Sequence, residues 1–197
     1  MADPGRYELP PHCQLIEVHV THLKQLFHSL DPTPFRERDL DPKAEEFIAS
    51  WARDLDPDKP IALVVHVDEA PPAAEMQTLH DAVRDYFAER MAATRRRLRQ
   101  LFRIGRTSLV IGLIFLAASI LTGDLLASVL EDTRFADVAR ESLLIGGWVA
   151  MWKPIEIFLY DWWPIRAEAK LMGRLSAMVV RVVPSSEASP PAAAPPR

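Results

Sequence analysis

The sequence predicts an α+β membrane protein, in which a small cytosolic α/β domain of about three strands and two to three helices is interrupted by a transmembrane helical hairpin. Two apolar runs, at 107–130 and 143–164, have the ~20 residues that a membrane helix needs. Segments that alternate like β-strands lie before and after them. The net charge of -4 is unevenly distributed along the chain. Residues 1–89 are acidic, with 18 acidic and 8 basic residues, whereas residues 90–106 contain seven arginines and no acid.

The chain opens with residues 1–14, which we expect to form a flexible arm because they are rich in proline and poor in apolar residues. A strand is predicted at 15–20, where Ile16, Val18 and Val20 share one face. The start of the chain lacks a basic segment followed by an apolar one, so we expect no cleavable signal peptide. The single cysteine, Cys13, excludes an intramolecular disulfide and fits a reducing compartment.

A helix is predicted from Pro42 to about Leu55, because Asp41 suits the N-cap and proline suits the first helical position. Its apolar residues recur at helical spacing and are expected to be buried. They are Phe47, Ile48, Trp51 and Leu55.

The most apolar strand begins at Ile61, and we expect it to be central in the sheet. A strand, a helix and a second strand in this order favour a parallel crossover. A long helix follows from about Ala74, since no glycine or proline occurs before Gly105, and it is expected to continue through the arginines into the first span. Its stripe of Met76, Leu79, Val83, Tyr86 and Phe87 is expected to cover the sheet.

The charges around the spans predict an orientation. The seven arginines precede the first span, five acids against two arginines occupy 124–141, and Arg166, Lys170, Arg174 and Arg181 follow the second span. The positive-inside rule then predicts an external loop at 131–142 and both termini in the cytoplasm.

The chain after the second span is expected to return to the cytosolic domain. Residues 165–183 contain an amphipathic helical stretch and then MVVRVV, which we interpret as a third strand of the sheet that begins at 15–20. The tail, 184–197, has low complexity and is expected to be disordered.

The second span carries a candidate polar site formed by Lys153, Pro154 and Glu156. Lys153 is near the middle of the apolar run, and Glu156 is three residues away, so the two can pair along one helix face. Pro154 leaves the carbonyl of Ala150 without its helical donor. Three interpretations stay open: an accommodated ion pair with a snorkelling lysine, a contact with a membrane partner, and a proton or ion relay in an oligomer.

Small residues also mark the two spans. Gly146 and Gly147 are expected to face a first span that carries Ser108, Gly112 and Ser119, because small side chains permit close helix packing. Packing within the hairpin accounts for them, and self-association in the membrane is the alternative.

A candidate ligand face lies on the less apolar side of the predicted sheet. Strand alternation places Glu17, His19, His66 and Arg181 there, where they could bind an acidic or phosphorylated ligand, or be covered by a partner. Metal binding is not predicted, because the donors have no recognisable ligand spacing. These donors are His12, Cys13, His19, His22, His28 and His66.

The arginine collar is defined as Arg95, Arg96, Arg97, Arg99, Arg103 and Arg106. Because an apolar span follows it directly, we expect it to contact anionic lipid headgroups rather than nucleic acid. No phosphate-binding loop, nucleophile elbow or catalytic triad occurs in the sequence, so neither an enzyme activity nor a cofactor is predicted.

The segments LFHSLDPTPFRERDLD and LLIGGWVAMWKPIEIFLYDWWPIR together resemble an uncharacterised family of small bacterial two-span membrane proteins, over about 15–183. That resemblance implies the architecture and a location in the bacterial inner membrane, but it assigns no catalytic residue. The sequence therefore favours a non-enzymatic scaffold or regulatory partner of a membrane complex. The alternatives are a membrane-tethered ligand sensor or enzyme that uses the polar sheet face, and an oligomeric ion or proton pathway.

Overall fold

The computed structural model describes residues 12–27, 40–68, 72–129 and 134–184. The chain divides into two compact units, which we call the sheet unit and the hairpin unit. The sheet unit comprises Met1–Ala92 and Glu168–Arg197, and the hairpin unit comprises Ala93–Ala167. The predicted flexible arm, apart from its end, and the tail beyond Pro184 lie outside the described residues.

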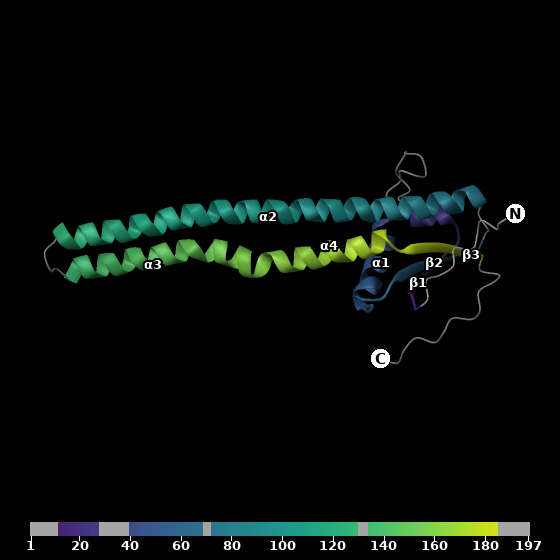
Figure 1. Ribbon diagram of the computed structural model, residues 1–197, viewed down its shortest axis with the longest axis horizontal. Coiled ribbons are helices and arrows are strands. Elements are labelled where there is room, and N and C mark those ends of the chain that lie inside the picture. The colour runs from purple at the N-terminus through teal and green to yellow at the C-terminus, as the bar shows by residue number, and fades with distance from the viewer. Residues whose placement is uncertain (1–11, 28–39, 69–71, 130–133, 185–197) are drawn as a thin grey trace. The chain divides into compact units, whose positions relative to one another are not determined.

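The sheet unit contains three parallel strands, β1 (Gln14–Val20), β2 (Ile61–Val67) and β3 (Val179–Pro184), in the order β1-β2-β3 (Figure 1). The predicted central position of the Ile61 strand is therefore confirmed. The return of the chain to the sheet after the apolar runs is also confirmed, because β3 pairs with β2 from Ala62↔Val179 to Val67↔Pro184.

One face of the sheet forms the core. Ile16, Leu63, Val65 and Val180 pack there with residues from three helices. These helices are α1 (Pro42–Asp54), α2 (Ala73–Val129) and α4 (Trp162–Ser176). Both crossovers step in the same direction across the sheet, and right-handed crossovers of that kind place their helices on the same side. On the opposite face Ala62 and Val64 are also buried, although they do not belong to this cluster.

Helix α1 begins as predicted, since the Oδ1 of Asp41 accepts a hydrogen bond from the Lys43 backbone at 2.9 Å. The predicted burial of its aromatic residues is wrong. Phe47 is 42% exposed and Trp51 is 51% exposed, whereas Ile48, Ala49 and Ala52 are buried. Two alanines let the helix backbone approach the sheet closely, and this turns the bulky rings outward. Leu55 is partly buried against the core.

Helix α2 runs without a break from Ala73 through the arginine collar to Val129, which confirms the predicted continuity. Leu79, Val83 and Phe87 are fully buried in the sheet unit, as predicted, and Tyr86 packs against the same core. A 3-10 helix, η1 (Leu23–Leu26), contributes Leu23 and Leu26 to this core.

The hairpin unit pairs the later part of α2 with α3 (Arg134–Glu156), a π-helix η3 (Ile157–Asp161) and the start of α4 (Figure 1). Helix α3 begins at Arg134, so most of the predicted loop 131–142 is helical. Two helical segments, Thr78–Val129 and Asp137–Ser176, are long and apolar enough to cross a membrane. They meet this criterion by length and composition alone.

Candidate functional site

The two helices of the hairpin unit pack through small residues. A Cβ added at Gly147 would lie 2.6 Å from Cδ1 of Leu116, and one at Gly112 would lie 3.0 Å from Sδ of Met151. The predicted packing within the hairpin is confirmed at these two glycines. It is wrong for Gly146, which has no atom within 4 Å of such a Cβ. Gly147 and Gly112 therefore set the distance between the helices, and Gly146 points away.

These contacts also fix which residues are at the same level. Gly105 lies beside Ile157, and Gly112 lies beside Ala150 and Met151. Counting from either contact, Lys153 is level with Leu109 and Val110, about one helical turn from Arg106. Lys153 is thus near the arginine end of the hairpin unit, and its expected position near the centre of a membrane span stays a prediction.

Lys153 forms a charged cluster with Glu156 and Asp161. Its Nζ donates a hydrogen bond to Oε2 of Glu156 at 3.0 Å and lies 3.6 Å from Oδ2 of Asp161. The first pair has the predicted three-residue spacing. Asp161 was not predicted, because eight residues separate it from Lys153 and only the π-helix, which has more residues per turn, brings it within reach.

The charged cluster faces outward rather than into the hairpin. The side chains of Lys153, Glu156 and Asp161 are 63%, 40% and 33% exposed, respectively. Pro154, between them in sequence, is buried against the hairpin. Two carboxylates against one ammonium leave the cluster with a net charge of about -1 at neutral pH. An outward surface of this kind can meet water, headgroups or another helix.

Aromatic side chains join the two helices next to the cluster. The ring of Phe102 lies 6.2 Å from that of Phe158 and 6.3 Å from that of Trp162. Trp162 donates its indole N–H to the Phe158 carbonyl at 2.9 Å, and the Arg166 guanidinium lies 5.6 Å from the Trp162 ring. Ring contacts therefore join the two helices on this side of the hairpin unit.

All six arginines of the collar are exposed. None of them makes an ion pair with another residue in the described part of the chain. Six guanidinium groups without an internal carboxylate partner are available for external anions, for which arginine geometry is well suited.

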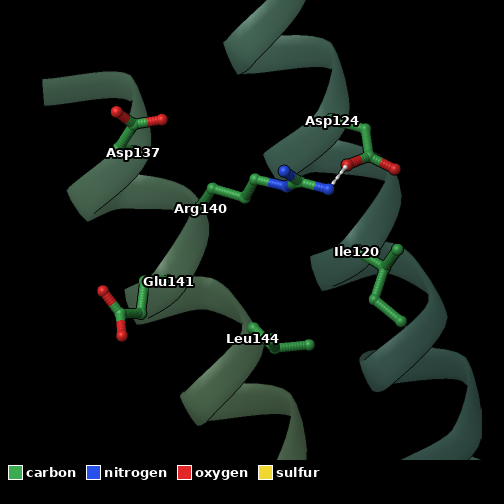
Figure 2. Close-up of a pocket in the computed structure, with 6 residues that line it drawn as sticks. All are labelled: Ile120, Asp124, Asp137, Arg140, Glu141 and Leu144. Atoms are coloured by element: carbon green, nitrogen blue, oxygen red, sulfur yellow. Dashed lines mark ion pairs between the residues drawn. The ribbon is translucent and has the colours of Figure 1, made fainter. Parts of the chain in front are cut away.

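The opposite end of the hairpin has its own charged residues. Figure 2 shows Arg140 reaching from α3 toward α2, where its Nη2 lies 2.9 Å from Oδ1 of Asp124. This pair borders a pocket of about 420 Å³, which Asp137 and Glu141 also line. In this view the Glu141 carboxylate points away from Asp124. The described residues contain no group of three donors suited to a metal ion.

The candidate ligand face of the sheet is assembled as strand alternation predicted. Glu17 is beside Val64, which is beside Arg181, and His19 is beside His66. The two imidazoles stack with centroids 4.3 Å apart, and Nε2 of His66 lies 3.9 Å from Oε2 of Glu17. Glu17, His19 and His66 are thus brought together, whereas Arg181 stands on the other side of Val64.

His66 is the unusual member of this face. The residue is 8% exposed, and within the described part of the chain neither ring nitrogen has a hydrogen-bond partner. The approach of Glu17 is too long for a hydrogen bond. Buried polar atoms are normally paired, so an unpaired imidazole at the centre of a sheet needs an explanation. His12, Cys13 and His22 do not join it in a metal-binding group, and His28 is outside the described residues.

A third polar group ties α1 to α2 in the sheet unit. Glu45 accepts hydrogen bonds from the Tyr86 hydroxyl at 2.6 Å and from Nε of Arg90 at 2.8 Å. Burial alone would raise the pKa of Glu45, but the hydrogen bonds from Arg90 and Tyr86 outweigh it and hold that pKa below its ordinary value. The group is structural, since its carboxylate oxygens are already occupied by these donors.

No protein-family model, curated protein or solved structure matched the chain.

Proposed function

We propose that this chain is a non-enzymatic, two-span protein of the bacterial inner membrane, whose sheet unit scaffolds or regulates a partner within a membrane complex. The observation that carries the proposal is the apolar outward surface of the hairpin between two charged ends. Large side chains such as Ile114, Leu121, Trp148 and Val149 are each at least 62% exposed. Only 17% and 22% of the most apolar windows of the two helical segments are buried.

A buried core helix of a soluble protein would have most of that window covered, so the low burial favours lipid as the missing environment. The length agrees. From Arg106 to Asp124 an α-helix rises about 27 Å, close to the ~30 Å hydrocarbon thickness of a bilayer. Asp124 and Arg140, paired at one end, would then lie near one interface, and the collar near the other.

The collar gives the proposed orientation. Clustered arginines next to a span favour the cytoplasmic side, where anionic headgroups attract them. Exposed Tyr160 and Trp163 belong to the same end of the hairpin, as expected of an interfacial aromatic belt. Lys153, one turn inside Arg106, would then direct its amine toward this interface along with Glu156 and Asp161.

The charged cluster is the proposed contact with a partner. Its net negative charge faces away from the hairpin, so a membrane helix that carries a basic residue at the same depth would complement it. An ion pathway is less favoured, because the cluster is on the outer surface of the hairpin and two helices enclose no pore.

Purification in a mild detergent tests the partner contact. A stable partner is expected to co-purify with the wild-type protein. Glu156→Leu, which removes negative charge from the cluster, should lower the amount of partner recovered, whereas Lys153→Leu, which leaves both carboxylates in place, should not. The exposed Ser128→Ala at the other end of the hairpin unit is the control. Recovery of the wild-type protein without any partner, in membranes that retain it after alkaline extraction, would contradict the scaffold role.

A further inference from the structure

Phe102 marks one side of the hairpin unit at its arginine end. Gly105 lies in the interface between the helices, since a Cβ added there would be 2.8 Å from Cγ2 of Ile157. The ring of Phe102 packs 6.2 Å from the ring of Phe158 and 6.3 Å from that of Trp162. We call the side of the hairpin unit that carries these three rings the aromatic side.

Two arginines of the collar lie on the aromatic side. An α-helix turns by about 100° per residue, so Arg99 and Arg106 are about 60° and 40° around α2 from Phe102. Both are displaced from the ring in the direction away from Gly105, one a turn before it and the other a turn after it. Arg97 is about 140° from Phe102 in the opposite direction and therefore lies on the other side of the hairpin unit.

Arg166 reaches the aromatic side from the other helix. Its guanidinium carbon lies over the face of the Trp162 ring, 5.6 Å from the centroid. Counting from the contact of Gly105 with Ile157, Arg166 is within about one helical turn of the level of Arg99. Three guanidinium groups are therefore gathered around the rings, two from α2 and one from α4.

The positive charge of these three arginines is not balanced within the hairpin unit. Arg99, Arg106 and Arg166 are exposed, and no described ion pair involves them. Among the described residues of the hairpin unit, the carboxylates at this end belong to Glu156 and Asp161, and both already contact the same lysine. An external anion is therefore the expected partner of the three guanidinium groups.

We propose that Arg99, Arg106 and Arg166, together with the ring of Trp162, bind the phosphate of an anionic phospholipid headgroup. A guanidinium donates two parallel hydrogen bonds to phosphate oxygens, which a lysine cannot do. Its N–H groups lie in its own plane, so Arg166 keeps them free to donate while its face rests on the ring. Stacking also restricts this side chain before the lipid arrives, which lowers the entropy lost on binding.

The place of the three arginines in the chain favours a lipid over a soluble anion. Arg106 directly precedes the apolar run, and Trp163, next to the stacked ring, is 64% exposed, as expected of a residue at a membrane interface. Arg99 and Arg106 are about 10 Å apart along α2. The interfacial layer is roughly 5–8 Å deep, so both long side chains can reach it. This inference rests on the proposed membrane hairpin.

Native mass spectrometry of the full-length protein in a nonionic detergent, titrated with phosphatidylglycerol, tests the site. Arg99→Gln and Arg166→Gln are each expected to weaken binding about fivefold. Arg97→Gln is the matched comparison, because it removes the same charge from the same stretch of α2 but on the other side. It should cause a smaller loss, of about twofold, since salt screens a charge on the far side of the helix.

Two further arms identify the ligand. Phosphatidylcholine, which has the same phosphate but no net charge, should bind the wild-type protein more weakly than phosphatidylglycerol. Inorganic phosphate at the concentration of the lipid should not displace bound phosphatidylglycerol. Equal binding of the two lipids would overturn the proposal, and displacement by inorganic phosphate would assign the three arginines to a soluble anion instead.

Equal losses in Arg97→Gln and Arg99→Gln would also overturn the site, because the collar would then attract lipid by net charge alone. An unchanged affinity in Arg166→Gln would do the same. Alkaline extraction of the membranes separates this proposal from the proposed function. Chains that stay in the membrane without a difference between the two sides of α2 contradict only the headgroup site, whereas chains that are extracted contradict the membrane hairpin.

Discussion

Lys153 approaches Asp161, eight residues later, to 3.6 Å because the intervening π-helix Ile157–Asp161 changes the phase of the chain. We predict that this pair is energetically coupled. A double-mutant cycle with Lys153→Leu and Asp161→Asn should give a coupling of about 0.5–1 kcal/mol, as for exposed ion pairs. The measurement is unfolding of the detergent-solubilised protein in sodium dodecyl sulfate.

A matched cycle that pairs Lys153→Leu with Asp137→Asn, at the other end of α3, should give no coupling. Equal coupling in both cycles would show that the effect is one of net charge and not of the contact.

The two neighbouring glycines of α3 are predicted to respond in opposite ways. Gly147→Leu adds a side chain where Leu116 already lies 2.6 Å from the Cβ position, so we expect it to destabilise the hairpin by about 1–3 kcal/mol. Gly146→Leu adds the same atoms where no atom is within 4 Å and should not destabilise it. Protease resistance of the hairpin in detergent measures the effect of each substitution. A larger loss of resistance in Gly146→Leu than in Gly147→Leu would contradict the hairpin packing.

We predict that Glu45 makes the folding stability of the sheet unit sensitive to acid. Its pKa is lower in the folded protein than in the unfolded chain, so its contribution to stability is present above the unfolded pKa and is lost as the pH falls through the folded one. Glu45→Gln should therefore reduce the loss of stability below about pH 4.5. Thermal unfolding followed by circular dichroism at several pH values measures this.

Tyr86→Phe removes one of the donors to Glu45 and should cost about 0.5–1.5 kcal/mol at neutral pH. The control for Glu45→Gln is Asp54→Asn, an exposed position on α1, the helix that also carries Glu45, since no described ion pair involves Asp54. An unchanged acid transition in Glu45→Gln would assign the sensitivity to another carboxylate.

The arginine collar is predicted to retain anionic lipid. Arg103→Gln and Arg106→Gln together should reduce the anionic phospholipid that co-purifies in detergent, because each arginine near such a surface contributes about 1 kcal/mol. Arg53→Gln, on exposed α1, removes the same charge outside the collar and should have no effect. Lipid content by mass spectrometry distinguishes them, and equal losses would argue against a local headgroup site.

The sheet was predictable from the sequence because its signals are local. Alternation identified the strand that begins near Leu15, the apolar run from Ile61 identified the central strand, and Asp41 with Pro42 identified the start of α1. The positions of Glu17, His19, His66 and Arg181 on one face followed from the same period of two.

Features that depend on packing were not predictable in the same way. Phe47 and Trp51 have the spacing of a buried stripe, but the small Ala49 and Ala52 decide which side of α1 meets the sheet. The level of Lys153 required the hairpin contacts of Gly105 and Gly112, and its contact with Asp161 required a π-helix that no spacing rule anticipates.

The start of α3 was missed for a different reason. Its first residues, from Arg134, are largely polar and charged. Hydropathy therefore placed the start of the predicted second span at Leu143, nine residues too late. A membrane helix often extends beyond the hydrocarbon region, and there its sequence resembles that of any exposed helix.

The measurement that tests the membrane hairpin most directly is cysteine labelling with a membrane-impermeant maleimide in intact spheroplasts, in a Cys13→Ser background. Ser128→Cys, exposed near the end of α2, and Ser50→Cys, exposed on α1, are the two probes. If the hairpin spans the membrane, we expect labelling of Ser128→Cys only in intact spheroplasts and labelling of both probes after permeabilisation. Labelling of Ser50→Cys in intact spheroplasts, or of neither probe before permeabilisation, would contradict a hairpin that spans the membrane from the cytoplasmic side.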